Sequence, residues 1–526
     1  MAGLDLDEWI TSSNECFEIN LIRPTSDPAD CDPIFSESFQ PTFTYPIINE
    51  KEILVGYKDP RIELNFRAND LKPSLKVQFE EKIDLSTILG DDDPQVDLEN
   101  VWKDFLPESV FDPSQAPSQP PSRNDPLSKS WKPPGKLIKS FSLSGKQFEV
   151  WGANMSDPAA HHIWDNMKIL TLLYIEGATY PDLDAQWSLE RWTLFLLYEV
   201  TPIEEDVSPY TLAGFSTSYR YWIYPTFDVM RATNSLPSPP TSSNGESPQF
   251  TGLQFARENG ECLFNDKLDL LESPSRERIS QFLILPPYQG QSLGANLYDT
   301  ILAHLVEKPF IYEVPVEDPS EDFDAMRDFS DIVYLRNMPE FASLALPATL
   351  PPETLRKSAP VPRDLILGNG RDLDELRQKS KIVPRQFNRM VELHHFCSIP
   401  INHRSKARIT RKDKASNEND RKYYFWRLAL KDRIYRQNAD QLEQLEDAAE
   451  RVEKLEMAVD SQQQEYEERE EGIERRKKWS RGEQQPEERR KPKGKRKRVV
   501  VDEDEDEDDG WEDMDEDAGA SKRPKL

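Results

Sequence analysis

The chain has 526 residues, a formal net charge of −30 at pH 7 and 31% charged residues. This length allows two or three domains, while the 42 prolines and the high charge indicate that sizeable segments lie outside any packed core. The acidic balance favours a cationic partner and argues against direct binding of nucleic acid.

Cysteine spacing and apolar run length exclude further classes of protein. The cysteines, at positions 16, 31, 262 and 397, show no paired spacing, so we expect no zinc site, no disulfide framework and no metal. The N-terminus lacks a basic region followed by an apolar stretch, and no apolar run approaches about 20 residues. We therefore expect an intracellular, soluble protein that does not contact membranes.

The N-terminal part of the chain predicts a small, sheet-rich module. Residues 17–22, 61–66 and 75–79 are short apolar or alternating runs, which are typical of strands. A stretch rich in proline and serine follows, and we expect residues 108–136 to form a disordered insertion.

The middle of the chain predicts a helix and a hairpin. Residues 164–175 place apolar side chains at helical spacing, and residues 192–200 and 212–224 are apolar runs that we expect to pair as two strands. A second stretch rich in proline and serine lies within residues 226–272, which we also expect to be a disordered insertion.

A strand, a loop of small residues and a helix expected at residues 296–306 then follow one another across residues 281–306. Small residues let the backbone approach a phosphate closely, and the first amides of a helix point outward at the positive end of its dipole. The loop therefore predicts a site for a phosphorylated cofactor. Its pattern, Gln-x-x-Ser-x-Gly-Ala, resembles motif A of the GNAT acetyltransferases, in which a glycine normally stands at the position of Ser292.

Two carboxylates follow the next predicted strand, residues 310–316. Acetyl transfer to lysine needs a neutral amine, and deprotonating a lysine at pH 7 costs on the order of 4 to 5 kcal/mol. Glu317 is the better candidate for general base because it closes an apolar strand, where it is partly desolvated. Asp318 matches a helix N-cap, with Pro319 at the first helical position and Glu321 as capping-box partner, so we expect it to be mainly structural.

The C-terminal part is helical and highly charged. Residues 442–459 lie close to a heptad series that Glu456 breaks, which predicts a helical segment more than a coiled coil. A basic cluster at residues 489–498 is typical of a nuclear import signal and directly precedes an acidic run, residues 502–517. The acidic run either binds a cationic partner or only solvates the tail.

Blocks along the chain together resemble the catalytic subunits of type B histone acetyltransferases, in a fungal form. They occur in the same order as in that family and span most of residues 17–336, interrupted by the two insertions. The blocks are residues 49–52 with 56–58, 190–192, 214–222, 282–295 and 316–329.

This resemblance implies an α+β fold: a GNAT-type mixed sheet flanked by helices, with an N-terminal sheet-rich substrate-binding domain and a helical C-terminal region. The expected domains are a histone-binding domain at 1–180, an acetyltransferase domain at 181–337, a helical region at 338–480 and a disordered tail at 481–526. It further implies a protein of nucleus and cytoplasm that works with a WD-repeat histone-binding subunit.

The implied activity is acetyl-CoA-dependent acetylation of N-terminal tail lysines on newly made, non-nucleosomal histone H4, alone or with its histone partner. Acetyl-CoA is the expected co-substrate, bound by backbone groups of one strand and one loop. The resemblance also implies a cofactor contact for Ser320, which a first-turn position in a helix explains equally well. The strand residues are Phe282, Leu283 and Ile284, and the loop residues are Gln289, Gly290, Gln291, Ser292, Leu293, Gly294 and Ala295.

The resemblance places two further blocks along a groove for the histone tail. Acids attract a basic tail, and aromatic walls cover the stem and charged head of a lysine. The blocks are Trp192 with Tyr219, Arg220 and Tyr221, and Glu50 with Lys51 and Glu52. Ordinary alternatives are that Trp192 and Tyr221 belong to the hairpin core and that the two glutamates form a solvated turn.

Two other functions fit the same residues. A histone-escort protein would use the fold and the acidic tail, with Ser292 weakening the cofactor site enough to abolish turnover. An acetyltransferase for small amines or non-histone proteins would keep the fold and change the substrate.

Overall fold

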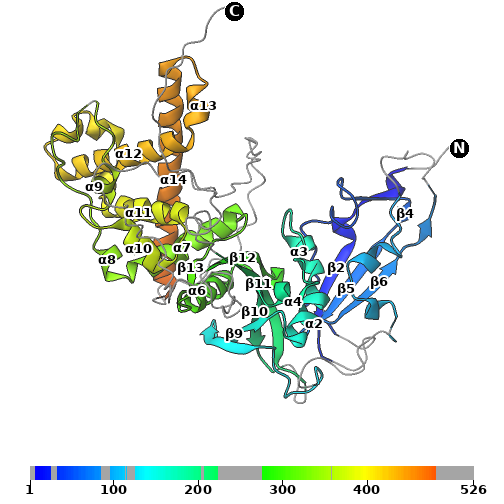
Figure 1. Ribbon diagram of the computed structural model, residues 1–526. Coiled ribbons are helices and arrows are strands. Elements are labelled where there is room, and N and C mark those ends of the chain that lie inside the picture. Colours follow the sequence, from blue (N-terminus) through cyan, green and yellow to red (C-terminus); the bar gives the residue numbers. More distant parts are fainter. Residues whose placement is uncertain are drawn as a thin grey trace, which may run out of the picture. The chain divides into compact units, whose positions relative to one another are not determined.

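The computed structural model describes residues 6–24, 32–84, 95–112, 114, 125–202, 207–222, 275–356 and 358–480 (Figure 1). All of these residues belong to one unit of the chain, Met1–Gln484. The expected insertion at 226–272 and the expected tail at 481–526, with its basic and acidic runs, lie outside the described residues.

Three small sheets form the N-terminal part, and they confirm the predicted strands. In the largest, β2 (Phe17–Ile22) runs parallel to β5 (Arg61–Arg67), which pairs antiparallel with β6 (Pro73–Gln78). Every second side chain of β5 is buried, as its sequence alternation predicts. The two smaller sheets pair β1 (Ile10–Ser12) with β3 (Ile53–Val55) and β4 (Tyr57–Lys58) with β7 (Glu81–Lys82).

The prediction that residues 108–136 form a disordered insertion is wrong at both ends of this range. Residues 108–110 form a 3-10 helix, and the Trp131 side chain is only 1% exposed. Trp131 packs edge-on against Tyr198 and Tyr210, with ring centroids 6.0 and 5.7 Å away. Burying an indole of this size stabilises the segment around it, which the proline and serine content of the sequence does not reveal. Residues 113 and 115–124 lie outside the described part of the chain.

A six-stranded mixed sheet, in the order β13-β12-β11-β10-β9-β8, carries the middle of the chain (Figure 1). All neighbours pair antiparallel except β12 and β13, which pair parallel. The predicted hairpin is confirmed as β10 and β11. The strands are β8 (Lys136–Leu143), β9 (Lys146–Asn154), β10 (Trp192–Val200), β11 (Tyr210–Trp222), β12 (Ser275–Ile284) and β13 (Ile311–Glu313).

Helices pack on both faces of this sheet. On one face, His304 of α6 (Leu293–Val306) packs against Phe195, with ring centroids 6.3 Å apart. On the other, Trp164 of α2 (Pro158–Met167) packs at the same distance against Phe215, and α3 (Ile169–Tyr174) and α4 (Gln186–Leu189) follow α2. Helix α6 begins at Leu293, so the expected start at residue 296 is wrong by about one turn.

The region after the sheet is helical, as predicted, and has its own hydrophobic core. Its long last helix, α14, buries Val459, Tyr466 and Ile473 at intervals of seven residues, whereas Val452 of the predicted heptad series is 61% exposed. The helices are α7 (Glu321–Arg336), α8 (Pro339–Ala342), α9 (Arg363–Leu367), α10 (Leu373–Ser380), α11 (Pro384–Ser398), α12 (Glu418–Gln437), α13 (Ala439–Glu443) and α14 (Ala448–Ser480).

Short 3-10 helices complete the described secondary structure. They are η1 (Leu6–Trp9), η2 (Asn14–Cys16), η4 (Val101–Asp104), η5 (Glu108–Val110), η8 (Pro286–Tyr288), η9 (Ile401–His403), η10 (Lys406–Ile409) and η11 (Lys412–Lys414). Within the described ranges, none of the helices is both long enough and apolar enough to cross a membrane.

The helical region contacts the end of α6 and the end of β13 through Lys381. The Lys381 ammonium donates to the carbonyl oxygens of Val306 and Lys308, at 2.7 Å each, which satisfies carbonyls that the last turn of α6 leaves unpaired. The Lys381 carbonyl accepts from the Val314 amide at 2.9 Å, just after β13. The helical region therefore holds the strand that leads into Glu317.

Candidate acyl-transfer site

Strands β12 and β13 separate in the middle of the sheet. Within the described residues, their pairing ends at a bridge between Ile279 and Val316. Strand β12 keeps its antiparallel neighbour β11 beyond that point, and the Leu285 amide donates to Ala213 at 2.9 Å. Because backbone groups alternate in direction along a strand, those of Phe282 and Ile284 face the side that β13 has left. An extended ligand has room to pair there as an added strand.

A short loop connects β12 to α6 and is held by its own side chains. The Gln289 amide group donates to the Ile284 carbonyl at 2.8 Å, and the Gln291 amide group donates to the Pro287 carbonyl at 3.0 Å. The first amides of α6 have no acceptor within the helix, which is the general condition of a helix N-terminus. A Cβ at Gly294 would lie 3.1 Å from the Met326 sulfur, so a small residue suits this position.

Ser292 is the N-cap residue of α6 and has φ +61°, in the left-handed region, with no capping hydrogen bond from its side chain. Glycine adopts this conformation without a Cβ penalty. We expect Ser292→Gly to raise the free energy of unfolding by about 0.5–1 kcal/mol, measured by urea denaturation.

Ser292→Ala is the matched control, because it removes the hydroxyl but keeps the strained Cβ. We expect no gain from it. An equal gain in both variants would show that the hydroxyl, and not the backbone conformation, is the source of the strain at this position.

Glu317 lies where the two strands separate, and its carboxylate is held by three neighbours. Its amide donates to the Ile279 carbonyl at 2.9 Å. The Tyr219 hydroxyl donates to Oε1 at 3.4 Å, the Arg278 guanidinium lies 3.5 Å from the same oxygen, and the Ser280 hydroxyl donates to Oε2. The side chain remains 35% exposed, so the carboxylate is fixed in position and still open to a substrate.

A row of aromatic side chains leads up to this carboxylate. The sheet register places Trp192 opposite Tyr219 and Tyr219 opposite Arg278. The Trp192 and Tyr219 ring centroids are 4.7 Å apart, and those of Tyr219 and Tyr221 are 5.9 Å apart. Burial, and then the charge of Glu317, raise the pKa of Tyr219, which therefore keeps its proton at neutral pH. The structure thus brings Trp192, Tyr219, Tyr221 and Glu317 together.

Arg220, which the sequence groups with these tyrosines, lies elsewhere. Its Nε is 3.1 Å from Oε2 of the buried Glu277, and its guanidinium lies 4.5 Å from the Phe310 ring centroid. Because neighbouring side chains of a strand point to opposite faces, Arg220 is on the α6 face of β11 and does not reach Glu317.

The helix after Glu317 does not have the predicted N-cap residue, Asp318. Helix α7 is capped by Ser320, whose hydroxyl accepts from the Phe323 amide at 3.2 Å. Asp318 lies two residues before this cap and has φ +31°, so it is not the N-cap of α7. Ser320 is therefore accounted for by a structural contact, and Asp318 is exposed.

The loop with the predicted tail-binding glutamates is held mainly by Glu52. One of its carboxylate oxygens accepts from the Thr44 and Tyr45 amides, at 2.7 and 3.3 Å, and the other accepts from the Asn14 side chain at 3.1 Å. Glu50 and Lys51 are exposed. In this loop, the exposed Glu50 is better placed than Glu52 to attract a basic peptide.

Sequence reasoning missed two neighbours of Glu317, namely Arg278 and Ser280. Both come from β12, the strand with which the Glu317 segment pairs, so they are close once the register is known. The signal that could have found them is their place in β12, a few residues before the loop of small residues and in the strand that precedes the candidate base.

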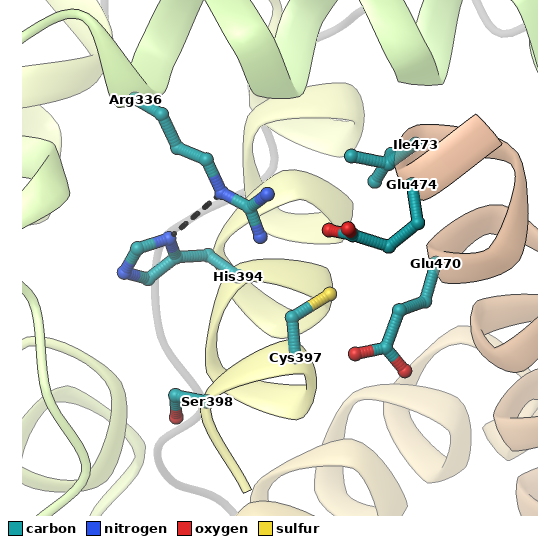
Figure 2. A pocket seen from close by; sticks show the side chains of 7 residues that line it. All are labelled: Arg336, His394, Cys397, Ser398, Glu470, Ile473 and Glu474. Carbon is teal, nitrogen blue, oxygen red and sulfur yellow. Dashed lines mark hydrogen bonds between the residues drawn. The ribbon is translucent and has the colours of Figure 1, made fainter. Parts of the chain in front are cut away.

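A separate cleft lies in the helical region, among α7, α11 and α14 (Figure 2). Its volume is about 240 Å³, and Arg336 donates to His394 across it at 3.4 Å. Figure 2 shows the Cys397 sulfur pointing toward α14, on the side where Glu470 and Glu474 lie. This cleft shares no residue with the site around Glu317.

Comparison with known proteins defines the class first. Residues 9–176 match the family model described as "Histone acetyl transferase HAT1 N-terminus". The chain is 34% identical to a histone acetyltransferase type B catalytic subunit from Gibberella zeae, over 86% of this chain and 88% of that protein. The protein of the same name from Aspergillus oryzae is 33% identical, over 88% and 85%. That from Candida albicans is 28% identical, over 88% and 90%.

The chain is therefore a histone acetyltransferase. More particularly, it belongs to the family of type B catalytic subunits, and the relatives compared above are all fungal. This membership implies acetyl-CoA as the acetyl donor and histones as the substrate class.

Proposed function

We propose that the chain transfers acetyl from acetyl-CoA to N-terminal tail lysines of newly made, non-nucleosomal histone H4. Transfer is direct, within a ternary complex, and Glu317 acts as general base. The observation that carries this proposal is the cross-strand row of Trp192, Tyr219 and Arg278, which ends at the Glu317 carboxylate beside the opening between β12 and β13. The mixed sheet that opens at this point is of GNAT type.

The residues along the opening suit acetyl-CoA, which supplies a reactive acetyl thioester when it is bound. The outward backbone groups of Phe282 and the outward amide of Ile284 would pair with its extended arm, whereas the Ile284 carbonyl already accepts from Gln289. The backbone groups of Leu283, which by alternation point toward β11, would not pair with it. The amides at residues 289–295 would hold the pyrophosphate, and glycine at position 294, which has no Cβ, suits a close approach of the backbone.

Glu317 accepts the proton that the lysine Nζ loses during transfer. Its contacts with Tyr219, Ser280 and Arg278 keep the carboxylate in one orientation, which lowers the entropic cost of proton transfer. A ternary complex needs no acyl-enzyme nucleophile, so we expect initial-velocity plots to intersect and not to run parallel.

The partly exposed rings of Trp192, Tyr219 and Tyr221 would flank the lysine stem, with Glu50 attracting the basic tail. In this account residues 1–180 bind the histone and residues 181–337 carry the transfer. A WD-repeat histone-binding subunit is the proposed partner. The chain works in nucleus and cytoplasm, with import by the basic cluster at 489–498, which lies outside the described residues.

The purified chain with labelled acetyl-CoA separates this function from its alternatives. We expect label on an H4 tail peptide and little on a polyamine or on assembled nucleosomes. Peptide binding without transfer would favour a histone escort. Faster labelling of the polyamine would favour an enzyme for small amines.

A further inference from the structure

Arg278 places a fixed positive charge directly beside the proposed base. Its guanidinium lies 5.8 Å from the ring centroid of Tyr219 and 5.2 Å from that of Tyr221. One of its nitrogens is 3.5 Å from Glu317 Oε1, and 35% of its side chain is exposed. Aromatic faces and a carboxylate are the two groups that a lysine ammonium also prefers, so Arg278 occupies the environment that suits a charged substrate side chain.

Among the described residues, the charged and titratable side chains in contact with Glu317 are Arg278 of β12 and Tyr219 of β11, while Ser280 is a neutral donor. Tyr221 of β11 lies against Arg278. An ammonium group that approached Glu317 would meet a second cation a few ångströms away, whereas a neutral amine would meet no such repulsion. The local charge therefore disfavours the form of lysine that cannot react.

We propose that Arg278 is a positioning residue that orients Glu317 and selects the neutral amine of the substrate lysine over its ammonium form. This inference rests on the proposed function of the same site. A cation disfavours a second positive charge beside it, so Arg278 favours the uncharged form of a lysine that approaches Glu317. As the neutral Nζ bonds to the acetyl carbon, the bond between that carbon and the thioester sulfur would break; Nζ loses one proton, which Glu317 accepts, and the sulfur would leave as a thiolate.

Arg278→Gln tests this role, because it removes the charge and keeps much of the side-chain length. We expect kcat to fall about tenfold, KM for the H4 tail peptide to fall, and the acidic limb of kcat to move up by about one pH unit, since a tenfold effect corresponds to one pKa unit. The sign follows because the cation lowers, and its loss raises, the pH at which the substrate amine beside it loses its proton. A merely structural role would lower kcat without moving this limb.

Two matched variants separate charge from packing. Arg278→Lys keeps the positive charge and is expected to restore the position of the acidic limb. Arg276→Gln makes the same charge change on the same strand, and Arg276 also lies over Tyr221, at 6.0 Å, but it pairs with Glu313 at 3.1 Å. We expect Arg276→Gln to leave the acidic limb where the unmodified chain has it.

Calorimetry with the H4 tail peptide gives a readout that does not need turnover. We expect Arg278→Gln to bind the peptide more tightly than the unmodified chain. Equal or weaker binding, or an unmoved acidic limb, would overturn the role of Arg278. Absence of acetyl transfer by the unmodified chain would instead overturn the proposed function, and the binding comparison would still decide the inference about Arg278.

Discussion

Glu317→Gln is expected to lower kcat/KM for an H4 tail peptide by about 10²–10⁴-fold, the usual contribution of a general base. Glutamine keeps the size of the side chain and can still accept a hydrogen bond from Ser280, but it cannot take up a proton from the lysine. The affinity for acetyl-CoA should not change, because the proposed cofactor contacts are made by residues 282–295. Steady-state kinetics with a calorimetric titration of acetyl-CoA measures both quantities.

Asp318→Asn is the matched comparison for this prediction. Asp318 is the adjacent carboxylate, it is exposed, and asparagine tolerates its positive φ. We expect this variant to keep most of the activity. A larger loss in Asp318→Asn than in Glu317→Gln would move the role of general base to Asp318.

Glu392→Ala is expected to lower the free energy of unfolding by about 3–5 kcal/mol, because it leaves a buried cation without its partner. Glu392 is fully buried in α11, and both of its oxygens lie within 3.1 Å of the Arg433 guanidinium. Its carboxylate also accepts from Tyr466 at 2.9 Å and from Arg363 at 3.3 Å. One side chain thus connects α9, α11, α12 and α14, and chemical denaturation measures its contribution.

An exposed ion pair in the same region provides the control. Glu375 and Lys379 lie 2.7 Å apart on α10, and both are well exposed. We expect Glu375→Ala to change the free energy of unfolding by less than about 1 kcal/mol, as is usual for surface pairs. Similar losses of unfolding free energy in both variants would contradict the prediction that the buried Glu392 contributes more than an exposed glutamate.

Periodicity predicts much of the fold but not where elements begin and end. Strand β2 occupies the predicted residues, 17–22. The predicted start of α6 is wrong because the helix begins after Ser292, which has a left-handed conformation. Serine rarely adopts this conformation, so the sequence does not indicate it. The ordered segment at Trp131 is missed because its stability comes from Tyr198 and Tyr210, which are distant in sequence.

Parts of the candidate site depend on information that only the register supplies. Glu317 is predictable because it follows a strand that must lie parallel to β12. Arg278 and Ser280 are not, because a register shift between Ser216 and Ser218 decides which β12 residues lie opposite β11. Arg220 is predicted to lie with Tyr219 and Tyr221 because the three are adjacent in sequence. Successive side chains of a strand point to opposite faces, and the sequence motif does not show this.

The central claim is that the opening beside β12 and the aromatic row beside Glu317 form one continuous site. A conjugate of coenzyme A joined to the acceptor lysine of an H4 tail peptide tests this claim most directly, in a calorimetric titration of the unmodified chain. If both parts occupy adjoining grooves, the conjugate should bind about 10²-fold more tightly than coenzyme A alone. An affinity no higher than that of coenzyme A would contradict the account, because the two grooves would then not meet at Glu317.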